Sequence, residues 1–94
     1  MDNIAALLED LTNAYGPSGF EGPVRAIMQR ELSPLCNHIE MDGMGSLMAR
    51  LCEGSDAPRV MMAAHMDEVG LMVKFVTKEG YVRFQPLGGW LDQA

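Results

Sequence analysis

The chain has 94 residues, of which 48% are hydrophobic, with a mean hydropathy of zero and a formal net charge of −6. This composition is typical of one globular domain and shows no signature of disorder. The acidic balance argues against nucleic acid or an anionic membrane surface as partner, because both are recognised by clustered Lys and Arg.

The N-terminal stretch MDNIAALLED carries acidic residues and lacks the apolar segment of a secretory signal. No run reaches the eighteen or so apolar residues that a membrane span requires. Two cysteines, Cys36 and Cys52, are compatible with a disulfide, but two thiols without an export signal are more often reduced. We therefore expect a cytoplasmic protein with no membrane partner.

The first predicted element is a helix that ends at the YGPSG stretch. Its apolar residues recur at i, i+3, i+4 and i+7, and Asp2 or Asn3 is placed to cap its start. Gly16 suits the C-terminal cap of a helix, and Pro17 cannot continue the helical hydrogen bonding. The apolar face consists of Ile4, Leu7, Leu8 and Leu11.

A second helix is predicted after this break. Ser18 and Glu21 have the spacing of a capping box, although Pro23 fits only in the first turn and moves the start toward Gly22. The predicted apolar face consists of Val24, Ile27, Met28, Leu32 and Leu35.

Strand-like patterns occupy the rest of the chain. HIEM and LMARL, joined by a turn at residues 42–45, predict a hairpin, and EGSDAP reads as a loop. RVMMAA, residues 59–64, is a continuous apolar run typical of a strand covered on both faces, although a helix remains possible by periodicity. GLMVKFV and YVRFQ, joined by the TKEG turn, predict a second hairpin with one solvated face.

His65 and Asp67 follow directly after the apolar run. If the chain stays extended, their side chains point to the same side, because the strand period is two residues. A metal-binding imidazole usually donates its second ring N–H to a carboxylate that fixes its orientation. The pair therefore fits a metal ligand with its orienting acid, and the competing interpretation is a partly buried histidine satisfied by a local carboxylate.

Other candidate sites are weaker. Cys36, His38, Cys52 and His65 contain the atoms of a tetrahedral zinc site but lack the short paired spacing of structural zinc domains. The nine methionines fit core packing better than a soft-metal surface.

Several stretches together resemble one family, the cytosolic glutamyl and deblocking aminopeptidases, which are dimetal metallopeptidases whose members build tetrahedral dodecamers. The likeness covers most of the chain and is most specific at AAHMDEVGLMV. LLEDLTNAYGPSGFEGPVR resembles the family's first helix, its glycine-proline break and its second helix. MDGMGSLMA is similar to a family hairpin, and GYVRFQPLGGW resembles the start of its inserted β-rich domain.

The resemblance implies an α/β fold: residues 1–70 would form the N-terminal part of a three-layer catalytic domain, and residues 71–94 the start of an inserted β-rich dimerisation domain. It implies that His65 ligates one of two divalent metal ions, zinc or cobalt, and that Asp67 orients it. Glu68 matches the pattern without an assigned role, and its simplest interpretation is a solvated acid. Peptides would be the substrates, and the full-length protein would be a homo-oligomer of up to twelve copies.

The family's remaining ligands and general base have no counterpart before Ala94, so we expect the N-terminal portion of a larger enzyme that is inactive alone. The alternative is a binding or assembly module in which the hairpin of residues 70–85 presents an edge strand to a partner and His65 is structural.

Overall fold

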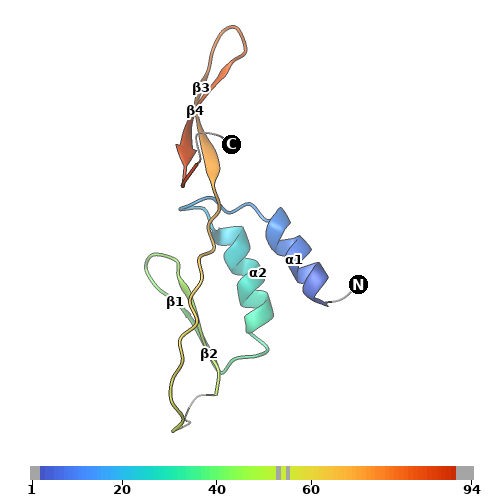
Figure 1. Ribbon diagram of the computed structural model, residues 1–94, viewed down its shortest axis with the longest axis vertical. Helices are drawn as coiled ribbons and strands as arrows, with labels where there is room; N and C mark the ends of the chain where they lie inside the picture. The colour runs from blue at the N-terminus through green and yellow to red at the C-terminus, as the bar shows by residue number, and fades with distance from the viewer. Residues whose placement is uncertain (1–2, 53, 55, 91–94) are drawn as a thin grey trace.

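The computed structural model describes residues 3–52, 54 and 56–90. In this part of the chain, two helices are followed by two antiparallel hairpins (Figure 1). The elements are α1 (Asn3–Asn13), α2 (Gly22–Leu32), β1 (His38–Met41), β2 (Leu47–Arg50), β3 (Gly70–Val76) and β4 (Val82–Leu87). Asp2, one of the two predicted caps of the first helix, lies outside the described residues.

Helix α2 begins at Gly22, as the position of Pro23 predicted, since proline is tolerated only in the first turn. The predicted capping box between Ser18 and Glu21 is wrong. Glu21 is itself the N-cap residue, and its carboxylate accepts a hydrogen bond from the Gly19 N–H at 2.8 Å instead of capping the helix. This contact stabilises the tight turn that leads into α2.

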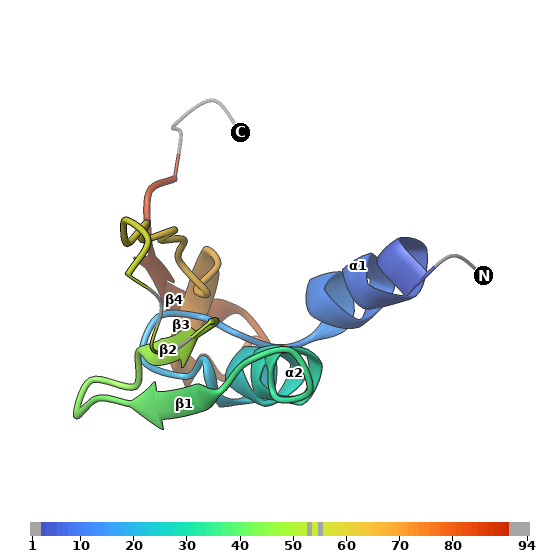
Figure 2. The same cartoon turned by 90° about the horizontal axis from the view of Figure 1, so that it is seen from below.

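Helices α1 and α2 lie side by side, as the two views of Figures 1 and 2 show. Arg30 of α2 bridges them, because its Nη2 lies 2.7 Å from Oδ2 of Asp10 in α1. Its Nε lies 2.8 Å from Oε1 of Glu31 in α2 itself. The apolar face predicted for α1 is present but largely uncovered, because Ile4 is 74% exposed and Leu8 is 60% exposed. The rest of the described chain therefore leaves this apolar face of α1 largely uncovered.

The first hairpin forms as predicted, with Met41 paired to Leu47 at the turn. Asp42 organises this turn: its Oδ1 accepts the N–H groups of Met44 at 2.9 Å and Ser46 at 2.8 Å. Gly45 adopts a φ of 90°, a conformation that side chains disfavour. The DGMGS sequence thus supplies both the acceptor and the glycine that the turn requires.

The prediction of a covered strand at residues 59–64 is wrong for the described structure. This segment has an extended path but no strand pairing, and Val60, Met61 and Met62 are 87%, 88% and 95% exposed. A strand needs a hydrogen-bonding neighbour on at least one edge, and no described strand pairs with this segment. The helical alternative is also wrong, since the segment contains no helix.

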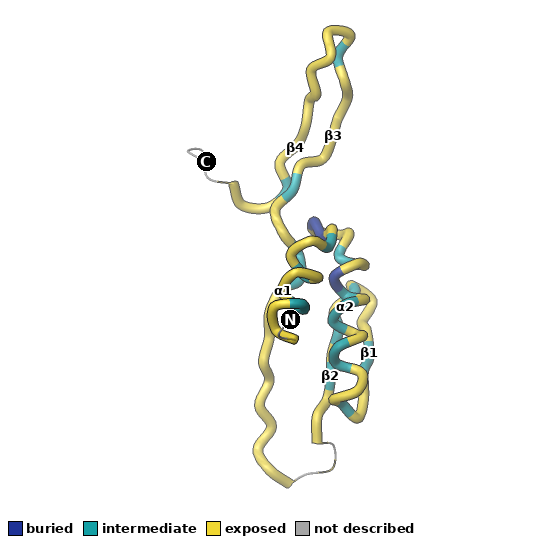
Figure 3. The backbone as a smooth tube through the Cα atoms, turned by 90° about the vertical axis from the view of Figure 1, so that its right-hand side faces the viewer, coloured by how far each residue is buried: buried dark blue, intermediate teal, exposed yellow. Residues whose placement is uncertain are grey.

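The second hairpin also forms, with Gly70 opposite Leu87 and an irregularity at Lys74, between Val73 and Phe75, that is typical of a β-bulge. One solvated face was expected, but side chains on both faces are exposed: Met72 is 51% and Val73 is 61% exposed. The hairpin projects away from the helices, as Figures 1 and 3 show, so no other described element covers it.

The molecule is elongated, with principal extents of 63 × 34 × 24 Å and a radius of gyration of 17.9 Å. A compact domain of this length would have a radius of gyration of about 12 Å. Figure 3 shows the result: most described residues are exposed, residues of intermediate burial gather on α2 and the first hairpin, and the buried residues lie near the start of α2. Across the described residues, no helix has both the length and the apolar character needed to cross a membrane.

Candidate metal centre

The structure brings His65 and Asp67 together. His65 Nδ1 lies 3.0 Å from the Asp67 carboxylate oxygen Oδ1 and 2.9 Å from the backbone carbonyl oxygen of the same residue. The extended backbone explains this contact, because alternate side chains of an extended chain share one side.

The two contacts fix which ring nitrogen carries the proton. A carboxylate and a carbonyl oxygen can only accept hydrogen bonds, so Nδ1 of His65 must be the donor. In a neutral imidazole the other nitrogen, Nε2, then has a free lone pair. This is the tautomer that a metal-binding histidine needs, with the metal on one nitrogen and a carboxylate behind the other.

The imidazole is open to its surroundings. The His65 side chain is 85% exposed and the Asp67 side chain is 40% exposed, so the alternative of a partly buried histidine is wrong. Among the described residues, no group of three or more His, Cys, Asp or Glu side chains could hold a metal ion. The described part of the chain can therefore supply one ligand of a metal site, the imidazole of His65.

The residues of the weaker zinc hypothesis take up separate roles. Both cysteines are free thiols, and Cys36 Sγ donates to the Leu32 carbonyl at 2.9 Å. His38 Nε2 lies 3.6 Å from Glu40 Oε2, two residues along the same strand, β1. The absence of a described three-ligand cluster speaks against a zinc site built from these groups.

Glu68 is exposed, which agrees with its interpretation as a solvated acid, and it also has a structural partner. Its Oε1 lies 3.3 Å from the Gly16 nitrogen, and its own N–H donates to the Gly16 carbonyl at 2.9 Å. A parallel bridge joins Pro17 to Glu68. The contact between Glu68 and Gly16 could not be predicted from the sequence, because the two residues are 52 positions apart. The helix break at YGPSG was the one local sign that Gly16 has a special role.

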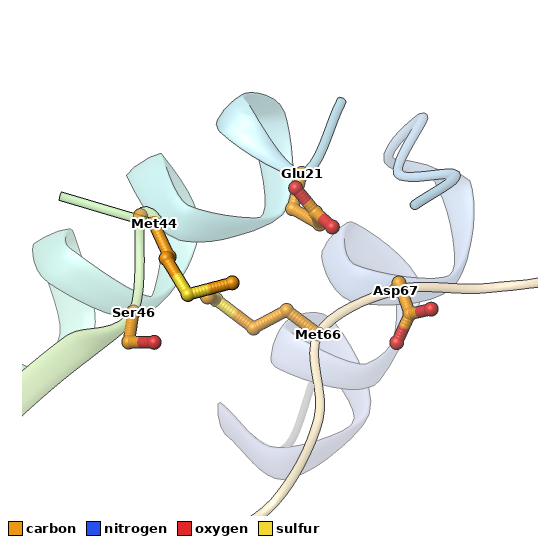
Figure 4. A pocket seen from close by; sticks show the side chains of 6 residues that line it. Glu21, Met44, Ser46, Met66 and Asp67 are labelled. Carbon is orange, nitrogen blue, oxygen red and sulfur yellow. The ribbon is translucent and has the colours of Figure 1, made fainter. Parts of the chain in front are cut away.

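A small cleft of about 110 Å³ lies beside this segment (Figure 4). Met44 and Met66 extend toward each other across it, and Glu21 and Asp67 contribute carboxylates from opposite elements. The lining residues come from the start of α2, the β1–β2 turn and the extended segment: Glu21, Met44, Gly45, Ser46, Met66 and Asp67.

The turn that lines this cleft is held on both sides. Arg25 of α2 donates from Nε to the Gly45 carbonyl at 2.7 Å, which ties the turn to the helix. Hydrogen bonds from backbone N–H groups, foremost that of Ser46, lower the pKa of Asp42 below its ordinary value. The charged carboxylate is therefore the form that stabilises the turn.

Comparison with known proteins identifies the chain's relatives. The sequence profile of the family described as M42 glutamyl aminopeptidase matches residues 45–94, more than half of the chain. The chain belongs to the M42 glutamyl aminopeptidase family. The resemblance found from the sequence motifs is thereby confirmed, and the matched region includes the extended segment with His65 and Asp67.

Curated relatives of this M42 chain extend the match toward the helices. The chain is 44% identical to the glutamyl aminopeptidase of Lactococcus lactis over 81 residues. The match covers 85% of this chain and 23% of that relative. The chain is 38% identical over 88 residues to the lysyl aminopeptidase of Pyrococcus furiosus, with coverage of 93% and 25%. The chain thus spans about a quarter of the length of these relatives.

Solved structures agree on the fold of the M42 chain. A TET aminopeptidase from the archaeon Thaumarchaeota archaeon SCGC AB-539-E09 matches with a TM-score of 0.86 and 42% identity, covering 98% of the chain and 26% of the solved one. PhTET1-12s, described as a dodecamer in the asymmetric unit, matches with a TM-score of 0.75 and 36% identity, covering 95% and 26%. The two helices and two hairpins are therefore an α/β portion of the TET aminopeptidase fold.

Proposed function

We propose that this chain supplies the N-terminal part of the catalytic domain of a metal-dependent aminopeptidase, with His65 as a ligand to one of two divalent metal ions. The observation that carries the proposal is the contact between His65 Nδ1 and Asp67, which leaves Nε2 available to a metal ion, in a chain whose relatives are named aminopeptidases. Imidazole suits several divalent transition metals, zinc among them, and we propose zinc or cobalt here.

The chain's own contribution is to hold and orient one ligand. Asp67 accepts a hydrogen bond from Nδ1 of His65, which sets the direction of Nε2. When bound, divalent metal ions would lower the pKa of a water molecule and polarise the peptide carbonyl. A catalytic zinc normally has three protein ligands, so the other ligands and a general base would come from outside the described residues.

The proposal includes an assembly. The β3–β4 hairpin projects with both faces exposed, as expected of a segment that packs against residues not described here. The dodecamer described for PhTET1-12s supports a homo-oligomer of the whole protein. We propose that residues 71–94 begin an inserted β-rich domain that contributes to this assembly, and that residues 1–70 belong to the catalytic domain.

A second candidate function rests on the same hairpin. Val73 and Phe75 are 61% and 57% exposed, which would also suit a binding module that docks a partner along the sheet edge. Such a module would not need a metal. Metal content of the whole protein therefore separates the two functions.

The test uses His65→Ala and Asp67→Asn in the whole protein, with metal analysis after dialysis and peptide turnover as measurements. His65→Ala should lose one metal ion and abolish turnover while retaining the fold, because the side chain is 85% exposed. Asp67→Asn keeps the shape and an acceptor oxygen but loses the charge, so a loss of roughly 10- to 100-fold in metal affinity or turnover is expected. The backbone contact to Nδ1 favours the lower end of this range.

The matched control is His38→Ala, the chain's other histidine, whose side chain is 47% exposed. It should keep both the metal content and the turnover of the parent. Retention of both metal ions and near-normal turnover by His65→Ala would refute the metal assignment. The binding-module alternative would then gain support.

A further inference from the structure

Glu68 holds both polar backbone groups of Gly16. The Gly16 nitrogen lies 3.3 Å from Glu68 Oε1, and the Gly16 carbonyl accepts the Glu68 N–H at 2.9 Å. One residue thus satisfies a donor and an acceptor of a single glycine with its side chain and its main chain. This reciprocal pairing fixes the orientation of the Glu68 peptide more strictly than one hydrogen bond could.

Glu68 is itself exposed, but its partner Gly16 lies at the most buried place in the described structure. Gly16 and Pro17 are buried, and Val24, the buried apolar side chain of α2, packs directly against Gly16. A Cβ on Gly16 would lie 2.7 Å from Val24 Cγ2, and a Cβ on Gly70 would lie 3.2 Å from Pro17 Cβ. The backbone of residues 16–17 is therefore packed closely against that of residues 68–70. This contact, the joint, is the most closely packed support for the neighbouring residues.

The segment on the other side of His65 has no comparable support. Residues 59–65 are exposed and pair with no described strand. Support for the imidazole within the described chain therefore comes from its C-terminal side, through Asp67 and the adjoining Glu68 peptide. A shift of that peptide would move the carboxylate that orients His65.

We propose that Glu68 is a positioning residue for the metal ligand: by clamping the Gly16 backbone it fixes the Asp67 main chain and, through it, the direction of His65 Nε2. The inference rests on the proposed function, since it assumes a metal at His65. Binding sites require their ligands to be held within about 0.5 Å, and partners behind a ligand change metal affinity by roughly 10- to 100-fold. Removal of the clamp should therefore weaken metal binding without removing any ligand atom.

The test titrates Co²⁺ into the metal-free whole protein and follows amide hydrogen exchange at residue 16 in the absence of metal. Glu68→Ala should raise the dissociation constant about tenfold and speed exchange at Gly16, because its N–H loses its acceptor. Glu68→Gln keeps an amide oxygen at the same position and should restore both quantities nearly to the parent values.

Two controls separate positioning from other effects. Glu79→Ala removes an exposed glutamate from the tip of the second hairpin and should change neither quantity. Val24→Ala loosens the packing against Gly16 but keeps the Glu68 contacts, so it should lower stability while Co²⁺ affinity stays within about twofold of the parent, well below the tenfold range for positioning partners.

Three outcomes would overturn the proposal. The first is a Glu68→Ala variant that binds Co²⁺ as tightly as Glu79→Ala does. The second is an equal loss of affinity in Val24→Ala, which would reduce the effect to general destabilisation. The third is a His65→Ala variant that binds Co²⁺ as tightly as the parent does. That result would show that His65 is not a metal ligand, so Glu68 could have no positioning role. Only this third result would also mark failure of the proposed function.

Discussion

Gly16 occupies a position where one added methyl group has a calculable effect. In Gly16→Ala the new Cβ would lie 2.7 Å from Val24 Cγ2. Two carbon atoms in ordinary contact are about 3.5–4.0 Å apart, so the pair is roughly 1 Å too close. Val24 is β-branched and lies in a helix, where one χ1 rotamer dominates, so the methyl group cannot rotate away freely.

Overpacking of this kind typically costs about 1–3 kcal/mol. The backbone can relieve the overlap only by moving Gly16, whose carbonyl and N–H both contact Glu68. We therefore expect Gly16→Ala to lower the free energy of unfolding of the whole protein by about 1–3 kcal/mol, measured by urea titration. The substitution should also disturb the Glu68 segment.

The double variant Gly16→Ala/Val24→Ala tests the cause. Removal of Cγ2 eliminates the overlap, so the two substitutions should be non-additive by about 0.5–3 kcal/mol, with the double variant more stable than the sum predicts. Gly22→Ala is the matched control, because a Cβ there meets nothing within 4 Å and should be neutral or slightly stabilising. Strict additivity, or a Gly16→Ala variant as stable as Gly22→Ala, would refute the reasoning.

Two further predictions follow from exposed features. The pKa of Asp42 is lowered in the folded state, so its contribution to stability is present above the ordinary pKa of 3.8 and is lost as the pH falls through the lower folded value. The stability difference between the parent and Asp42→Asn should be constant near neutral pH and shrink below 3.8, and a pH-independent difference would contradict this. The 94-residue chain alone should self-associate through surfaces such as Met61 and Met62, which are 88% and 95% exposed, as measured by sedimentation at rising concentration. The same chain should show no peptidase turnover with added Zn²⁺ or Co²⁺. A monomer that melts cooperatively, or a chelator-sensitive peptidase activity, would count against it.

The elements that could be predicted from the sequence are those whose contacts are local. Helices α1 and α2 are encoded by apolar residues three and four positions apart, and the two hairpins by turn residues such as Asp42 and Gly45. The His65–Asp67 contact was also predictable, because it depends only on the two-residue period of an extended chain. These features need no information about distant residues.

The features that could not be predicted depend on distant partners. The apolar run at residues 59–64 has the composition of a covered strand, but pairing requires a neighbour, and none lies among the described strands. Glu68 gave no local sign of its contact with Gly16, since an acid after a metal-ligand motif is equally compatible with solvent. A sequence pattern specifies what a segment can pair with and leaves open which segment it meets.

The joint between Gly16 and Glu68 closes a loop of 52 residues. The entropy lost on closing a flexible loop of that length is about 3.5 kcal/mol from the logarithmic term alone. Two hydrogen bonds contribute about 1–3 kcal/mol net, which does not offset this loss. The helices and hairpins can form early from neighbouring residues, whereas the His65 segment should be the last part to acquire its native geometry. We therefore expect the order of events in folding to separate the scaffold from the proposed metal ligand, His65, which would reach its native geometry only when packing from elsewhere in the protein closes the loop.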